Sequence, residues 1–412
     1  MTRRQRIDLY CLCWNDARML PFFFLHYDSI VDRYFVFDNG STDDSLSLLQ
    51  SHGRVEMAHF ETPGDSFVNE ERRLGNSMWQ NSDADWVIVT DIDEHIYHPD
   101  LRGYLERCTE DGITAIESGG FEMVAESFPR GTEPLVEQVT TGMRSFAHNR
   151  LCIFNPKAIE ETNFNAGRHN AVPTGRVKWP SIREVLLLHY KQLGSDYLVG
   201  RSAELLTGLR PGDIANKWGV QYTWSAEEII AFWRRIMGLA RPVPGLGVLK
   251  HIEPAKYFED EYIVDSSGLF LGDWYLRANP DVQRAGAPAF AHYCSHGWRE
   301  RRRPNYYFDP DWYCDTYPQL VNSGSNPLVS FILKGEKEDA RPSENFDTAW
   351  YRNRHGLTAE ESPLRHFLAR RTSGLVSPLP EFDVTDYCAN HPEVLKESRD
   401  PFEEFRLNEM AR

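Results

Sequence analysis

A repeat of about 37 residues in the last third of the chain sets strict limits on how that region can fold. The pattern Phe-x-x-x-Trp-Tyr begins at Phe270, Phe308 and Phe346, and a fourth copy beginning at Phe382 has Asp in place of Trp. Each unit has the pattern of a short helix around the Trp-Tyr pair, a turn, and a second helix beginning at a Pro. One unit is too small to bury its aromatic rings, whereas stacked units can bury them. The sequence therefore predicts a small all-α repeat domain of four units over residues 268–412, in which the shortened last copy caps the array.

The first 130 residues have a different pattern, in which apolar strand-like segments alternate with helical ones. The expected strands are residues 7–13, 34–37, 55–57 and 86–90, and the expected helices are residues 16–33, 42–51 and 67–80. Such alternation with short turns is typical of an α/β domain that has a mostly parallel sheet with helices on both faces. Shorter strand patterns follow, and then a capping box at Ser225 and Glu228 opens an amphipathic helix. We therefore expect an α/β domain at residues 1–240, a linker at 241–267 and the repeat domain at 268–412.

Composition narrows the class of function. The chain has 45 Lys and Arg against 61 Asp and Glu, a formal charge of −16, which argues against a nucleic-acid-binding protein because such proteins need a basic face. No apolar segment approaches the roughly 18 residues of a membrane span. The seven Cys are an odd number without a Cys-x-x-Cys pair, a pattern that favours buried thiols in a reducing compartment. These features predict a cytoplasmic protein with no transmembrane segment.

Polar clusters follow three of the predicted strands. They are Asn15-Asp16, Asp38-Asn39 and Asp91-Ile92-Asp93-Glu94. Ligands of open α/β sheets bind at the carboxyl ends of the strands, so these clusters are expected to meet at one edge. Strand alternation would place Asp91 and Asp93 on the same side, where two carboxylates can hold a divalent cation that binds a diphosphate. The alternative is that these residues only form turns and cap helices.

Together, three segments resemble motifs of the family-2-type glycosyltransferases, which have the Rossmann-like GT-A fold. The segments are Cys13-Trp14-Asn15-Asp16, Phe37-Asp38-Asn39-Gly40-Ser41-Thr42-Asp43 and Trp86-Val87-Ile88-Val89-Thr90-Asp91-Ile92-Asp93-Glu94. The last segment is most similar to the branch of the family in which this motif has the sequence D-x-D-E. The resemblance covers about the first 200 residues. It implies an inverting transferase that uses Mn²⁺ or Mg²⁺ and takes its sugar from a nucleotide-diphosphate sugar.

The resemblance also implies roles for the matching residues. Asp38 and Asn39 would contact the nucleoside part of the donor, and Asn15 would also bind the donor. Asp91 would face the ribose or the metal, and Asp93 would be the main metal ligand.

Four basic residues outside these motifs are further candidates for the donor site. Arg73 lies on the helix before the D-x-D strand and could contact the base or the diphosphate. His189 and Lys191 end an apolar strand in a segment that resembles an H-Y-x segment of the same branch. His189 is expected to be a third metal ligand or to bind the diphosphate, and Lys191 would add positive charge to the donor site. His169, in the polar loop 167–170, is a further donor-binding candidate.

An inverting transferase also needs a general base for the acceptor hydroxyl. The Glu-Asp pair that supplies it in the family has no clear match in this chain. Glu122 and then Glu117, both just beyond the strand predicted near residues 113–116, are the candidates.

The resemblance therefore implies transfer of a sugar to a glycan, lipid-linked or protein acceptor, as in the assembly of bacterial surface polysaccharides, by a protein in the cytoplasm or peripheral at the inner membrane. The repeats resemble aromatic units that accompany bacterial glycosyltransferases and could bind a protein or glycan partner, although their aromatic residues fit a repeat core as well. Two alternatives are a nucleotidyltransferase, which would release pyrophosphate, and a non-enzymatic scaffold with an inactive sugar-nucleotide domain.

Overall fold

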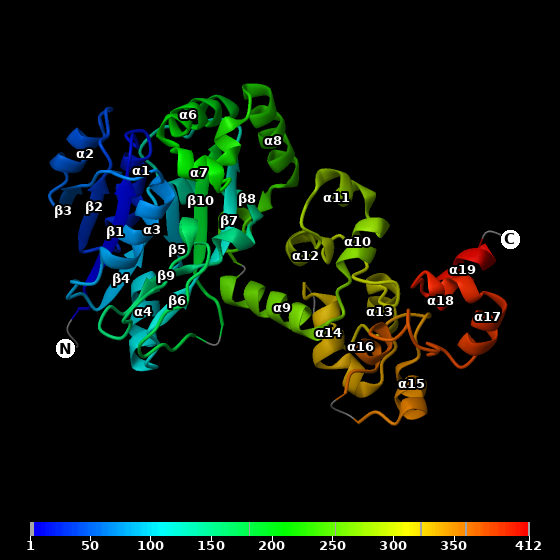
Figure 1. Ribbon diagram of the computed structural model, residues 1–412. Helices are drawn as coiled ribbons and strands as arrows, with labels where there is room; N and C mark the ends of the chain where they lie inside the picture. Colours follow the sequence, from blue (N-terminus) through cyan, green and yellow to red (C-terminus); the bar gives the residue numbers. More distant parts are fainter. Residues whose placement is uncertain (1–3, 181, 252, 322–323, 359–360, 411–412) are drawn as a thin grey trace. The chain divides into compact units, whose positions relative to one another are not determined.

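The computed structural model describes residues 4–180, 182–251, 253–321, 324–358 and 361–410. The chain divides into two compact units, Met1–Phe258 and Glu259–Arg412 (Figure 1). The first unit is a mixed α/β structure with two sheets, and the second is helical.

The first sheet has the strand order β3-β2-β1-β4-β9-β6. Its strands are β1 (Ile7–Cys13), β2 (Arg33–Asp38), β3 (Val55–His59), β4 (Trp86–Val89), β6 (Ala115–Glu117) and β9 (Leu151–Phe154). The pairs β1–β2, β2–β3 and β1–β4 are parallel, whereas β9 runs antiparallel to both β4 and β6. The carboxyl ends of β1, β2 and β4 therefore lie at one edge, as the sequence predicted.

Helices cover both faces of this sheet, because alternate residues of its buried strands face different cores. Ile7, Leu9 and Cys11 of β1 pack in one core with residues of α1 (Leu20–Tyr27) and α4 (Leu101–Glu110). Tyr10 lies in a second core with Trp79, which follows α3 (Phe67–Ser77). Helix α2 (Ser45–Ser51) connects β2 to β3.

The second sheet departs from the prediction of one mostly parallel sheet. Its order is β11-β8-β7-β10-β5, with β5 (Glu94–Tyr97), β7 (Gly119–Ala125), β8 (Thr141–Arg144), β10 (Leu186–Leu193) and β11 (Arg241–Pro242). Only β7 and β10 pair in parallel here; the pairs β5–β10, β7–β8 and β8–β11 are antiparallel. The prediction was wrong in this respect. Parallel neighbours are usually connected by a long crossover helix, and the connections between β7, β8, β9 and β10 contain only a four-residue helix and 3-10 turns.

Helix α1 starts later than residue 16, where the sequence suggested that a helix begins. The Asp16 carboxylate accepts a hydrogen bond from the Trp14 N–H (3.0 Å) and pairs with Arg201 (2.6 Å), and residues 17–19 form a turn. The Asp16 carbonyl accepts from the N–H groups of Met19 and Leu20 at 2.9 Å. Asp16 is therefore held back at the sheet edge instead of entering the helix.

The remaining helices of the first unit follow β7 and β10. They are α5 (Leu135–Gln138), α6 (Ser195–Gly208), α7 (Pro211–Ala215) and α8 (Ala226–Leu239), and 3-10 turns lie at Phe146–His148, Ala166–Arg168, Val220–Thr223 and Gly247–Leu249. Residues 241–267, expected as a linker, contain β11 and the helix α9 (Pro254–Ser267).

The second unit is built from short helices. They are α10 (Gly272–Ala278), α11 (Pro280–Ala285), α12 (Ala289–His292), a π-helical turn (Tyr293–Gly297), α13 (Pro310–Thr316), α14 (Pro327–Leu333), a 3-10 turn (Gly335–Glu338), α15 (Thr348–His355), α16 (Pro363–Leu368), α17 (Val384–Asn390), α18 (Pro392–Lys396) and α19 (Pro401–Met410). Tyr275, Tyr313 and Tyr351, the second residues of the repeated Trp-Tyr pairs, lie fully buried in α10, α13 and α15. Within the described ranges, no helix has the length and apolar character needed to cross a membrane.

Two stacked histidines are buried in the first unit, where they affect its stability. The rings of His26 (α1) and His95 (β5) lie 4.5 Å apart at 17°, and the Nε2–H of His26 donates to the Ile96 carbonyl at 2.8 Å. Burial lowers the pKa of His26 to about 4, although this hydrogen bond raises it, and burial also lowers the pKa of His95. Both rings are therefore neutral in the folded protein at pH 7.

We predict that acid destabilises the first unit through these rings. The unfolded chain takes up a proton near pH 6.5 and folded His26 only near pH 4, so stability is lost as the pH falls through this window. His26 alone should cost about 2 kcal/mol in the free energy of unfolding between pH 7 and pH 5. Denaturant unfolding at both pH values should show a smaller loss in His26→Gln than in the wild type. The exposed His251→Gln is the control, and an equal loss in all three proteins would contradict the prediction.

Candidate functional site

The D-x-D residues lie on a turn that joins the two sheets. Strand β4 ends at Val89 and β5 begins at Glu94, so Asp91 and Asp93 are not consecutive same-side positions of one strand, as alternation had suggested. The Glu94 carboxylate accepts hydrogen bonds from the Asp91 N–H (3.1 Å) and the Thr90 hydroxyl (3.3 Å). Buried Glu94 thus holds the turn, and the two aspartates project from it toward different partners.

His189 brings Asp93 and Glu122 together. On neighbouring strands of the second sheet, His189 (β10) lies in register with Glu122 (β7) and with Glu94 (β5). Its Nδ1 is 2.9 Å from Glu122 Oε1, and its Nε2 is 3.4 Å from Asp93 Oδ2. The imidazole therefore lies between two carboxylates.

The charges of this trio support one another. Burial by itself would lower the pKa of His189, but Glu122 and Asp93 raise it to about 10. Burial would likewise raise the pKa of both carboxyl groups, but the cationic ring lowers that of Glu122 to about 2 and also lowers that of Asp93. In the absence of another cation, this site holds an imidazolium between two ionised carboxylates.

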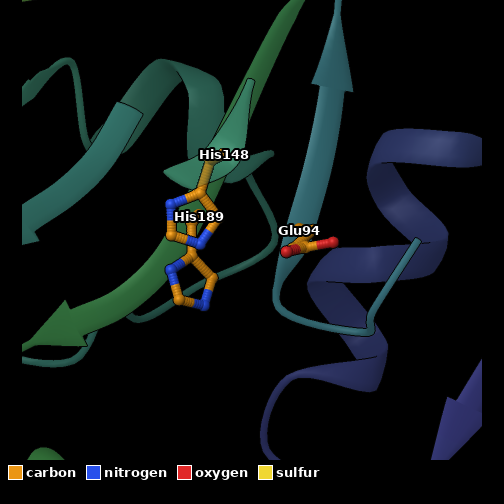
Figure 2. Close-up of side chains that lie close together, drawn as sticks. All are labelled: Glu94, His148 and His189. Carbon is orange, nitrogen blue, oxygen red and sulfur yellow. The ribbon is translucent and has the colours of Figure 1, made fainter. Parts of the chain in front are cut away.

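A second histidine, His148, lies beside His189. The two rings lie next to each other (Figure 2), with centroids 4.5 Å apart. The Nδ1 of His148 is 2.8 Å from the Ser145 hydroxyl. Burial lowers the pKa of His148 to about 4. Ligand atoms of Glu94, His148 and His189 lie within 4.8 Å of one another, so these three residues form a potential metal-binding group. Glu94, however, is also paired with Arg150, which leaves its carboxylate less available to a metal than that of Asp93.

Two buried arginines that the sequence analysis did not select stabilise the acidic turn. Arg168 pairs with Asp91 and lies 4.0 Å from Glu71, and Arg150 pairs with Glu94. Arg150 also donates to the Gly167 carbonyl at 2.9 Å. Both Gly167 and Arg168 have positive φ angles (67° and 54°), and the glycine in that polar loop was the only sequence signal of this unusual backbone.

The loops after β1 and β2 are held by their own polar side chains. Asn15 Oδ1 accepts from the Thr42 N–H at 2.7 Å, and buried Asp38 accepts from the N–H groups of Gly40 (2.8 Å) and Ser41 (3.1 Å). Asp38 therefore shapes the turn, while the half-buried Asn39 next to it hydrogen-bonds through its N–H to the Cys13 carbonyl (3.0 Å).

Arg201 of α6 is a further basic residue of this edge that the sequence analysis missed. It pairs with Asp16 at 2.6 Å and donates to the carbonyls of Trp14 (3.1 Å) and Asn15 (2.8 Å). Burial raises the pKa of Asp16 to about 6, although the charge of Arg201 lowers it.

The other predicted residues occupy separate environments. Lys191 donates to the Tyr222 hydroxyl at 2.9 Å, and the Nδ1–H of His169 donates to the Ala147 carbonyl at 2.9 Å. Arg73 is exposed on α3 and pairs with Glu70, and Glu117 pairs with Arg183. The structure thus groups Asp93, Glu122 and His189, whereas Asp91 pairs with Arg168 and the contacts of Arg73 and Glu117 lie elsewhere.

Comparisons with known proteins give partial similarities. No known family description matches the sequence. A mycobacterial protein of known crystal structure is 18% identical over 29% of this chain and 41% of its own, with a TM-score of 0.23. A glucosyl-3-phosphoglycerate synthase from Mycobacterium tuberculosis, solved in complex with phosphoglyceric acid, is 15% identical over 37% of this chain and 57% of its own, with a TM-score of 0.24. This chain therefore spans about half the length of the structures it matches.

We predict that the Glu94–Arg150 pair is needed for the stability of the first unit. Both side chains are at most 5% exposed, so Arg150→Met would leave an unpaired buried carboxylate and cost about 3–5 kcal/mol of unfolding free energy. The double variant Glu94→Gln/Arg150→Met should recover part of that loss in urea unfolding. As a matched control, Arg183→Met breaks the partly exposed pair with Glu117 and should cost about 1 kcal/mol or less. Equal losses for Arg150→Met and Arg183→Met would contradict the prediction.

Proposed function

We propose that the protein is a metal-dependent, inverting glycosyltransferase that moves a sugar from a nucleotide-diphosphate sugar to a hydroxyl group of a glycan, lipid-linked or protein acceptor. The observation that carries the proposal is the position of His189, with Nδ1 at 2.9 Å from Glu122 and Nε2 at 3.4 Å from Asp93 of the D-x-D motif. The order of the three sequence motifs along β1, β2 and β4 supports it, because the motifs lie at the carboxyl ends of these parallel strands, where ligands of open α/β sheets usually bind.

Asp93 and His189 fit a Mn²⁺ or Mg²⁺ ion. Carboxylates are suitable ligands for both cations, and imidazole suits Mn²⁺ better than the harder Mg²⁺. A histidine ligand usually has its other ring nitrogen held by a carboxylate, and Glu122 holds Nδ1 of His189 in this way. Asp91 would add a second carboxylate to the metal or bind the ribose. When bound, the ion offsets the negative charge that develops on the leaving diphosphate.

The donor would bind along the edge formed by β1, β2 and β4. Asn15 and Asn39 follow β1 and β2 and would contact the nucleoside, with Asp38 fixing the turn that presents Asn39. Lys191 would bind the diphosphate. His169 is close enough to Asp91 and Arg168 for their charges to affect its pKa. The exposed Arg73 would then reach only a part of the donor that extends over α3.

The acceptor hydroxyl must lose its proton as it attacks the sugar, and we propose His169 as the base. Its Nδ1–H donates to the Ala147 carbonyl, which leaves the lone pair of Nε2 free to accept a proton. Burial lowers the pKa of His169, although that hydrogen bond raises it, so the ring is neutral at pH 7. Glu122, the base expected from the sequence, has a pKa of about 2 and would be a weak base, which suits it to positioning His189.

The two other functional classes remain alternatives that experiment can separate. A nucleotidyltransferase would release pyrophosphate, and a scaffold would bind no donor. We also propose that residues 268–412 form a four-unit repeat domain that binds a protein or glycan partner, and that the protein acts in the cytoplasm or at the inner membrane.

We predict that donor binding depends on Asp93. In a thermal-shift panel of UDP-, GDP-, CMP- and dTDP-sugars with and without Mn²⁺, one nucleotide class should raise the Tm of the wild type in the presence of Mn²⁺. Asp93→Asn should lose this shift because it removes the charged metal ligand. Glu117→Gln, which alters a carboxylate paired with Arg183, should keep it. A well-folded wild type that responds to no donor would favour the scaffold.

We predict separate effects for Glu122 and His169. Glu122→Gln should weaken Mn²⁺ binding by about 10–100-fold, because the amide orients His189 less firmly. His169→Gln should lower kcat by about 10²–10⁴-fold and leave Mn²⁺ and donor binding unchanged. The decrease of kcat at acid pH should be present in the wild type and absent from the residual activity of His169→Gln. Asn170→Ala, at the neighbouring position, is the control. A large loss of kcat in Glu122→Gln with unchanged Mn²⁺ affinity would instead identify Glu122 as the base.

A further inference from the structure

Arg18 lies on a pair of aromatic rings next to the candidate site. Its guanidinium carbon is 4.3 Å from the centroid of the Phe128 ring and 5.0 Å from that of Tyr197. The two rings contact each other, with centroids 4.5 Å apart, and Phe128 also packs edge-on against buried Phe22 (6.0 Å). Three separate elements meet here: the turn after β1, the loop after β7 and helix α6. We call Arg18, Phe128 and Tyr197 the arginine platform.

The elements that carry the platform are fixed by other contacts. Gly194 has a φ of 94°, and a Cβ there would lie 2.8 Å from the Cα of Ser127, so the start of α6 packs closely against the loop that carries Phe128. Arg201, one helical turn after Tyr197, pairs with Asp16, two residues before Arg18. The rings and the turn that hold Arg18 are therefore already in place before a ligand binds.

The hydrogen-bonding groups of Arg18 are free. No hydrogen-bond acceptor or carboxylate among the residues that the structure describes pairs with its guanidinium, and the side chain is exposed. By contrast, Arg150, Arg168 and Arg201 each pair with a carboxylate of the site. A guanidinium offers donors in a planar fork that matches a carboxylate or a phosphate, and aromatic rings beneath it reduce the entropy lost on binding.

The two rings of the platform follow strands of the second sheet, and Arg18 follows β1 of the first sheet. Phe128 follows β7 and Tyr197 follows β10, whereas the nucleoside-binding candidates Asn15 and Asn39 follow β1 and β2 of the first sheet. Tyr197 is also near the proposed metal ligand: burial raises its pKa, and the charges of Asp93 and Asp16 raise it further. A ligand group on Arg18 would thus be close to Asp93.

We propose that Arg18, supported by Phe128 and Tyr197, binds a carboxylate or phosphate group of the sugar acceptor. This inference rests on the proposed transferase function. It assigns the acceptor to the anionic class: a sugar acid, a phosphorylated sugar or a phosphate-bearing lipid head group. The same chemistry would also suit the diphosphate of the donor, and the experiment has to separate these two sources.

Inorganic phosphate is the probe, titrated at constant ionic strength against the full chain by thermal shift. Phosphate should raise the Tm of the wild type, and Arg18→Met should weaken the apparent affinity by about tenfold or more, because charge-assisted hydrogen bonds are lost. Arg18→Lys should fall in between. Arg130→Met, which removes an exposed positive charge two residues after Phe128, should behave as the wild type. Equal phosphate shifts in Arg18→Met and the wild type, or no shift in the wild type, would overturn the proposal.

A second arm repeats the titration in the presence of saturating UDP or another responding nucleotide with Mn²⁺. If the phosphate effect persists, the anion site is separate from the donor site, as expected for the acceptor. If nucleotide abolishes it, Arg18 serves the donor diphosphate and the acceptor assignment is wrong. The first arm needs no nucleotide, so failure of the proposed transferase function to show donor binding would be distinguishable from failure of the arginine platform. Circular dichroism of each variant establishes that it is folded.

Discussion

The buried pair between Glu94 and Arg150 is the interaction on which the candidate site depends. Glu94 begins β5, and its carboxylate also accepts from Asp91 and Thr90, so it sets the course of the turn that carries the D-x-D residues. Arg150 precedes β9 and holds the Gly167 carbonyl, which positions the loop of Arg168 and His169. One buried ion pair therefore joins the acidic turn to the basic loop, and a charge left alone there would be strongly unfavourable.

Charge balance organises the rest of the site. Asp91 forms an ion pair with Arg168, and Asp16 forms one with Arg201. Asp93 and Glu122 both pair with the imidazolium of His189. A divalent cation would take the place of the proton on His189 and compensate the same two carboxylates, so metal binding and the protonation of His189 are coupled.

Much of the fold could be predicted because it depends on local pattern. The strand Ile7–Cys13 has the predicted bounds, and the carboxyl ends of β1, β2 and β4 lie at one edge as the alternation of strands and helices required. The second sheet could not be predicted in the same way. Its strands are short, and β10 lies between β7 and β5, which come from much earlier in the chain. Such pairing depends on contacts between distant segments, which hydrophobic periodicity does not encode.

The sequence by itself determined which chemical groups are available: the D-x-D-E segment after an apolar strand, the polar turns after β1 and β2, and an aromatic repeat in the last third of the chain. Only the tertiary structure decided which of them meet. It turned the chain between Asp91 and Asp93, brought His189 between Asp93 and Glu122, and placed Arg168 and Arg150 rather than Arg73 against the acidic turn. The physical reason is that a carboxylate buried by the fold must find a cation. Which cation is near enough depends on the pairing of strands far apart in sequence.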